Sequence, residues 1–131
     1  MQVKIIIGVG GGTGSGKTTF SQKLMELLGP ERVLLLSQDD YYNDRSDLPL
    51  EKRLQLNFDE PEAVDFRLLI NQLRRLQQGR PVAKPKYDFK QHIRRREADS
   101  VSPRQILLVE GTLVFARLEL AQCFDLKIFE F

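Results

Sequence analysis

The sequence predicts an α/β domain in which helices flank a parallel sheet, and three observations support this fold class. Residues 3–9, 32–36 and 105–111 form short, mostly apolar runs, as expected of strands buried on both faces. Residues 66–76 carry apolar side chains at helical spacing between the second and third runs. A glycine-rich segment joins the first run to another helical pattern. The 131 residues are enough for one domain with a substantial core.

The glycine-rich segment fits the phosphate-binding motif G-x-x-x-x-G-K-[ST] from Gly11 to Thr18. Glycines let backbone N–H groups face phosphate oxygens without a Cβ in the way, and the next helix adds unpaired N–H groups. A chance turn is the alternative, but a strand before and a helix after are the context that the motif requires. No G-x-G-x-x-G register exists, which excludes a dinucleotide fingerprint. The segment therefore predicts the P-loop nucleoside triphosphatase fold, with nucleotide-binding residues Gly11, Gly12, Thr13, Gly14, Ser15, Gly16, Lys17, Thr18 and Thr19.

Two helical patterns are expected to pack on the sheet. The first has an apolar face formed by Phe20, Leu24, Leu27 and Leu28, and Gly29-Pro30 is expected to end it. Residues 43–57 are polar and predict a loop with a helical turn after Pro49. The second helix is predicted to start with Pro61 at its first position and to end at Gly79. Its apolar stripe predicts core packing and consists of Phe66, Leu69, Ile70, Leu73 and Leu76.

Two acids follow the second apolar run, at the edge of the sheet where ligands of open α/β folds bind. A kinase needs a carboxylate that orients the acceptor hydroxyl and takes its proton. Asp39 and Asp40 both suit this role by position, and either also suits a turn cap in a polar loop.

The third apolar run also ends in an acid, Glu110, which can hold Mg²⁺ directly or through water or can cap the next turn. Residues 118–124 predict a short helix and 125–131 a final strand. Residues 81–89 alternate and contain prolines, which is typical of an edge strand or a hairpin arm. Residues 90–96 are strongly basic and hold the single histidine, His92. This segment is either a solvated face or a contact with a polyanion or a substrate base, and it is too short to support a nucleic-acid interface.

Composition and the length of the apolar runs argue against a membrane-spanning protein and against one held together by disulfides. Charged residues make up 29% of the chain and the net charge is +2, which is ordinary for a soluble domain. The first apolar run is too short to span a membrane. A single cysteine, Cys123, excludes an internal disulfide and suits the reducing cytoplasm.

Taken together, these residues resemble the uridine kinase (uridine–cytidine kinase) family of P-loop kinases over essentially the whole chain. The resemblance rests on five segments in order: Gly11–Thr18, Leu36–Tyr42, Asn57–Pro61, Tyr87–Phe89 with His92, and Val109–Gly111. It implies one P-loop kinase domain over residues 1–131, with a hairpin-like nucleoside-binding insertion near 80–103. It also implies transfer of a phosphoryl group from ATP or GTP to the 5′-hydroxyl of uridine or cytidine, with Mg²⁺, in pyrimidine salvage.

The resemblance also implies roles for individual residues. Asp39 is the expected catalytic base, and Lys17 contacts the donor phosphates. Thr18, Glu110 and Asp39 are the expected Mg²⁺ ligands, directly or through water. Asp59 binds the ribose hydroxyls. The nucleoside pocket is walled by Phe58, Tyr87 and Phe89, and Tyr42 and His92 reach the base.

Family members continue beyond the strand that matches Lys127–Phe129, with a lid helix rich in arginine, a further strand and part of the adenine site. Arginines that neutralise the transferring phosphoryl group are worth about 10³–10⁵ in rate in related enzymes. The domain is therefore expected to be incomplete, to bind more readily than it turns over, and to self-associate through exposed apolar surface. A non-catalytic nucleotide-binding module and a phosphoribulokinase-like enzyme are the alternatives. The Phe58-Asp59 element and the aromatic pair Tyr87 and Phe89 speak against the second.

Overall fold

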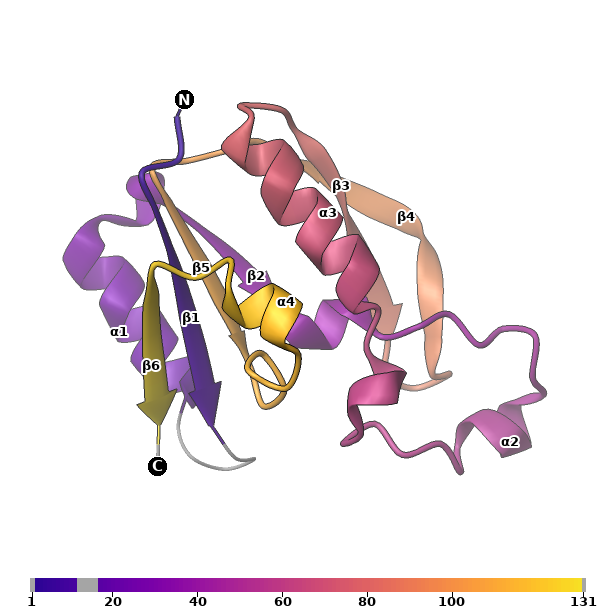
Figure 1. Cartoon of the computed structure of the whole chain (residues 1–131). Coiled ribbons are helices and arrows are strands. Elements are labelled where there is room, and N and C mark those ends of the chain that lie inside the picture. Colours follow the sequence, from indigo (N-terminus) through magenta and orange to yellow (C-terminus); the bar gives the residue numbers. More distant parts are fainter. Residues whose placement is uncertain (1, 12–16, 131) are drawn as a thin grey trace.

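The computed structural model describes residues 2–11 and 17–130, without the side chains of residues 17–19. Within that part of the chain, four parallel strands form the main sheet in the order β2-β5-β1-β6 (Figure 1). These strands are β1 (Ile5–Gly11), β2 (Val33–Ser37), β5 (Ile106–Gly111) and β6 (Leu126–Glu130). The predicted parallel sheet is therefore confirmed. Strand β5 pairs with both β1 and β2, so the first two strands along the chain are not neighbours.

Helices cover both faces of this sheet, as continuously apolar strands require. Helix α1 (Lys17–Leu28) packs on one face, where Ile7, Val9 and Leu108 meet its apolar side chains. The other face packs against α3 (Phe66–Gln77) and the short α4 (Leu118–Ala121), through residues such as Ile6 and Leu107 (Figure 1). None of the helices in the described ranges has the length and hydropathy needed to cross a membrane.

The two predicted helices differ from the sequence pattern at one residue and one boundary. Leu27 was expected on the apolar face of α1 but is 84% exposed. The predicted stripe of α3, in contrast, is buried at all five positions. Helix α3 begins at Phe66 rather than Pro61, because residues 61–63 form a separate 3₁₀ helix and Asp65 caps α3 by accepting from Leu68 N at 3.1 Å.

The end of α3 has the expected glycine in a left-handed conformation, with φ +81° at Gly79. Gly79 N donates to Leu76 O and Arg80 N donates to Arg75 O, each at 3.0 Å, which is the Schellman pattern. This turn sends the chain into β3 (Val82–Asp88), which pairs antiparallel with β4 (Ile93–Val101) in a separate two-stranded sheet. The expected hairpin arm is thus present. The expected helical turn after Pro49 is α2 (Leu50–Arg53).

Two glycines in β1 leave room for aromatic rings on the α3 face of the sheet. A Cβ at Gly8 would lie 2.6 Å from the Phe124 ring, and one at Gly10 would lie 2.5 Å from the Phe115 ring. These distances are well inside van der Waals contact, so a larger residue at either position forces the ring to move. The interruption of the first apolar run by glycine therefore has a packing reason.

The burial difference between Leu73 and Leu27 predicts a difference in stability. Leu73 is fully buried under the sheet, so Leu73→Ala should lower the free energy of unfolding by about 2–5 kcal/mol. Leu27→Ala is the matched control in an exposed helical position and should change it by less than about 0.5 kcal/mol. Urea unfolding followed by circular dichroism measures both. Equal losses for the two variants would contradict the burial of Leu73 and the exposure of Leu27.

Candidate active site at the carboxyl edge of the sheet

The candidate site lies where β1, β5 and β2 end side by side. Glu110 on β5 stands opposite Val9 of β1 and Ser37 of β2. Its side chain is buried. Strand β1 precedes the glycine-rich segment in the sequence and β2 leads into Asp39, and β5 places Glu110 between the ends of these two strands. Residues 12–16 of the predicted phosphate loop lie outside the described residues, as do the side chains of Lys17, Thr18 and Thr19.

The residues after β2 form a 3₁₀ helix, Gln38–Tyr41, and Gln38 attaches it to the end of β5. The Gln38 side chain is fully buried, and its Oε1 accepts from Leu113 N at 2.6 Å. It fills the space beside Gly111, where an added Cβ would lie 2.3 Å from Gln38 Oε1. The sequence pattern did not predict this role of Gln38, because its position in a polar stretch gives no sign that the side chain is buried.

The two candidate acids have different surroundings. Asp40 Oδ2 pairs with Lys84 Nζ at 2.9 Å, and their side chains are only 25% and 17% exposed. Asp39 is exposed and accepts from the Tyr42 hydroxyl at 3.1 Å. Asp40 thus holds β3 against the 3₁₀ helix, whereas Asp39 faces solvent beside the end of the sheet.

Tyr41 and Arg94 also fasten the hairpin to this region. The buried Tyr41 hydroxyl donates to Gln72 Oε1 at 2.7 Å, and Gln72 Nε2 donates to Ala83 O at 2.8 Å. Burial raises the pKa of Tyr41, with a smaller contribution from Asp40, so this donor keeps its proton. Arg94 Nη2 on β4 donates to Tyr42 O at 2.9 Å. Helix α3, the 3₁₀ helix and the hairpin therefore act as one unit.

The aromatic side chains predicted to form a nucleoside pocket lie together. The Tyr42 ring stands edge-on to those of Phe58 and Tyr87, with centroids 5.0 and 5.3 Å away, and Phe89 lies 5.3 Å from Tyr87. These contacts and the stack of His92 on Phe58 define the aromatic cluster: Tyr42, Phe58, Tyr87, Phe89 and His92. Asp59, the predicted ribose ligand, is exposed next to Phe58.

His92 has an unusual backbone conformation that places its ring on Phe58. Its φ is +53°, which L-residues other than glycine rarely adopt. The turn before it is fixed by Asp88, whose carboxylate accepts from Lys90 N at 2.9 Å and Gln91 N at 3.1 Å. These backbone hydrogen bonds lower the pKa of Asp88. The stack on Phe58 has ring centroids 4.8 Å apart and 23° between planes. A strained residue held over an aromatic ring is a candidate for a functional contact.

The tyrosines of the aromatic cluster stay protonated at neutral pH. Burial raises the pKa of Tyr87 to about 12, and Asp44 adds to this shift. Burial also raises the pKa of Tyr42, and so does the neighbouring Asp39 carboxylate. Both hydroxyls are therefore neutral: the Tyr42 hydroxyl donates to Asp39, whereas the buried Tyr87 oxygen has no hydrogen-bond partner among the described residues.

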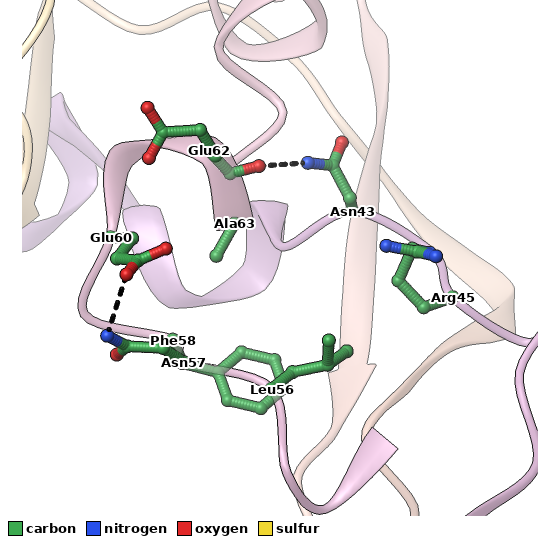
Figure 2. A pocket seen from close by; sticks show the side chains of 8 residues that line it. All are labelled: Asn43, Arg45, Leu56, Asn57, Phe58, Glu60, Glu62 and Ala63. Carbon is green, nitrogen blue, oxygen red and sulfur yellow. Dashed lines mark hydrogen bonds between the residues drawn. The ribbon is translucent and has the colours of Figure 1, made fainter. Parts of the chain in front are cut away.

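A pocket of about 220 Å³ adjoins the aromatic cluster through Phe58 (Figure 2). Its walls come from the loop after Tyr42 and from residues 56–63, which carry Asp59. Two hydrogen bonds brace these walls: Asn43 Nδ2 donates to Glu62 O at 2.9 Å, and Asn57 Nδ2 donates to Glu60 Oε1 at 3.1 Å (Figure 2). The lining combines charged and apolar groups, and consists of Asn43, Arg45, Leu56, Asn57, Phe58, Glu60, Glu62 and Ala63.

The acids at the sheet edge suit a magnesium ion held partly by other groups. Among the described residues, no three His, Cys, Asp or Glu side chains come close enough to hold a metal by themselves. Mg²⁺ commonly takes one or two carboxylates together with phosphate oxygens and water. Glu110, at the end of β5 beside the strand that leads to the glycine-rich segment, supplies an oxygen donor of that kind.

Comparison with known proteins places this fold in a kinase family. The model of the phosphoribulokinase / uridine kinase family matches residues 6–130. Uridine kinase from Ligilactobacillus salivarius is 44% identical over 125 residues, which are 95% of this chain and 59% of that protein. The chain thus spans about 60% of the length of such relatives.

Two solved structures share the fold. One is described as a "possible uridine kinase" from Bacillus stearothermophilus, with a TM-score of 0.75, 23% identity, and coverage of 98% of this chain and 71% of that one. The other is phosphoribulokinase from Rhodobacter spheroides, with a TM-score of 0.64, 19% identity, and coverage of 98% and 50%. At these identities the likeness establishes the fold alone, and the family match and the relatives establish membership. The chain belongs to the phosphoribulokinase / uridine kinase family.

Proposed function

We propose that this chain carries the acceptor side of a uridine or cytidine kinase. The proposal depends chiefly on one observation: the exposed Asp39 carboxylate is joined to the aromatic cluster by the Tyr42 hydroxyl, at 3.1 Å. A nucleoside whose flat base packs against the cluster would bring its ribose 5′-hydroxyl toward the Asp39 carboxylate. The uridine kinases among the relatives support a nucleoside as the acceptor.

The reaction transfers the γ-phosphoryl group of ATP, or GTP, to the nucleoside. The 5′-oxygen bonds to the γ-phosphorus while the bond to the β–γ bridging oxygen breaks, and the hydroxyl proton passes to Asp39. Asp40 is a poorer candidate for this role, because Lys84 already pairs with it. Phe58, Tyr87, Phe89 and His92 would bind the base, and Asp59 would bind the ribose hydroxyls.

The part of the site that would bind the phosphate donor is proposed from the sequence. Lys17 would contact the β- and γ-phosphates, and the glycine-rich residues from Gly11 to Thr19 would bind the phosphates through backbone N–H groups. Thr18, Glu110 and Asp39 would hold Mg²⁺, which supplies charge neutralisation at the transferring group when bound. A nucleotide-binding module without turnover is the alternative, because the chain spans about 60% of the length of its relatives.

The product of the reaction tests this proposal. Incubation with ATP, Mg²⁺ and uridine should yield 5′-UMP and ADP in equal amounts, separated by liquid chromatography. Uridine lacking its 5′-hydroxyl is the matched control and should give neither. Nucleotide binding without product would favour the non-catalytic module. Faster ADP release with ribulose 5-phosphate than with uridine would instead favour a phosphoribulokinase-like activity.

Substitution of each acid tests the choice of base. Asp39→Asn should lower the rate of phosphoryl transfer by about 10²–10⁴-fold, because no other carboxylate takes the hydroxyl proton. Binding of ATP and uridine, measured by calorimetry, should be nearly unchanged. Asp40→Asn is the matched control: it should weaken the attachment of the hairpin and lower stability, while folded protein keeps most of its activity. Transfer at the wild-type rate in Asp39→Asn would rule out Asp39 as the base.

A further inference from the structure

Tyr42 contacts both the aromatic cluster and the candidate catalytic acid Asp39. Its ring lies at the centre of the aromatic cluster, between Phe58 and Tyr87. Its hydroxyl donates to Asp39 Oδ1 at 3.1 Å. No other described member of the cluster makes a hydrogen bond to Asp39. Tyr42 is therefore the direct connection between the surface that would hold a base and the carboxylate that would accept a proton.

The backbone of Tyr42 is held on several sides, so its hydroxyl has a fixed direction. Tyr42 forms an isolated antiparallel bridge with Val64, and its carbonyl accepts from Arg94 Nη2 at 2.9 Å. The preceding carbonyl, Tyr41 O, accepts from Asp65 N at 2.7 Å. The buried ring has edge-on neighbours at 5.0 and 5.3 Å. A reorientation of the hydroxyl would have to disturb this packing.

Asp39, in contrast, has little else to hold it. Its side chain is exposed, and an exposed carboxylate exchanges freely among rotamers. The hydrogen bond from Tyr42 occupies one carboxylate oxygen, Oδ1, and leaves the other for an acceptor hydroxyl. Fixing a catalytic group in its reactive geometry removes an entropic part of the barrier, which raises kcat without tightening substrate binding.

We infer that Tyr42 is a positioning residue that orients Asp39 through its hydroxyl, an inference that rests on the proposed kinase function. The family resemblance assigns Tyr42 a different role, contact with the base. The hydroxyl donates its single proton to Asp39, so toward a base it would act as a hydrogen-bond acceptor only. The two roles predict different kinetic effects when the hydroxyl alone is removed: a lower kcat if it orients Asp39, and weaker uridine binding if it contacts the base.

Tyr42→Phe separates these roles, because it keeps the ring and its packing. If Tyr42 orients Asp39, kcat for uridine phosphorylation should fall about 10- to 100-fold, and the uridine dissociation constant from calorimetry should change less than about twofold. Tyr41→Phe is the matched control, since it removes a buried hydroxyl that donates to Gln72 instead. Tyr41→Phe should lower the urea concentration at the midpoint of unfolding and leave kcat within about twofold of the wild-type value.

A second measurement does not depend on turnover. The chain has three tyrosines, so [ζ-¹³C]tyrosine labelling gives three resonances, and the Tyr→Phe variants assign them. Asp39→Asn should shift the Tyr42 resonance, because the hydroxyl loses its charged acceptor, and should leave the Tyr87 resonance in place.

Each result then bears on the inference. A loss of kcat with unchanged uridine affinity, together with the resonance shift, supports it. Weaker uridine binding with unchanged kcat would assign Tyr42 to the base, and no effect on either constant would show that its hydroxyl is not needed. Both results overturn the inference. If wild-type protein forms no UMP, the kinase proposal fails, and the resonance shift alone decides whether Tyr42 orients Asp39.

Discussion

The candidate site depends on how the 3₁₀ helix Gln38–Tyr41 is fastened between the sheet and the hairpin. Its first residue attaches to the loop after β5, its third to Lys84 of β3, and its fourth through Gln72 to Ala83 O. Only the second residue, Asp39, is exposed. Because the residues on either side of Asp39 are held by these contacts, Asp39 has a defined position while its carboxylate stays accessible to a substrate.

The cost of burying polar groups explains why these contacts come together. Gln38, Tyr41 and Gln72 are all buried, and a buried polar group left without a partner costs about 1–3 kcal/mol. Gln38 Oε1 and the Tyr41 hydroxyl have their partners on other elements. Movement of the hairpin away from α3 would therefore break hydrogen bonds and the Asp40–Lys84 pair together. The hairpin and the acid should thus keep one relative arrangement before any substrate binds.

The elements that depend on local sequence pattern could be predicted from the sequence. The features that depend on contacts between residues far apart in the chain could not. The strands, the stripe of α3 and the turn at Gly79 follow from periodicity and glycine chemistry, and all were found. The exposure of Leu27 and the late start of α3 were not predictable this way. Leu27 fits the apolar face of the helix, but that part of the face does not contact the sheet. The bridge between Tyr42 and Val64 keeps Val64 extended, which separates the 3₁₀ helix at residues 61–63 from the start of α3. The separate roles of Asp39 and Asp40 depend on Lys84, which is 44 residues from Asp40.

The glycines of β1 have a consequence for how this sequence can change over time. The Phe124 ring occupies the space in which a side chain at position 8 would begin, and Phe115 does the same at position 10. A side chain at either position requires the facing ring to move or to be replaced by a smaller one. Replacement of both residues together is therefore the route that preserves the packing. Substitutions at 8 and 124, or at 10 and 115, should appear together in divergent lineages.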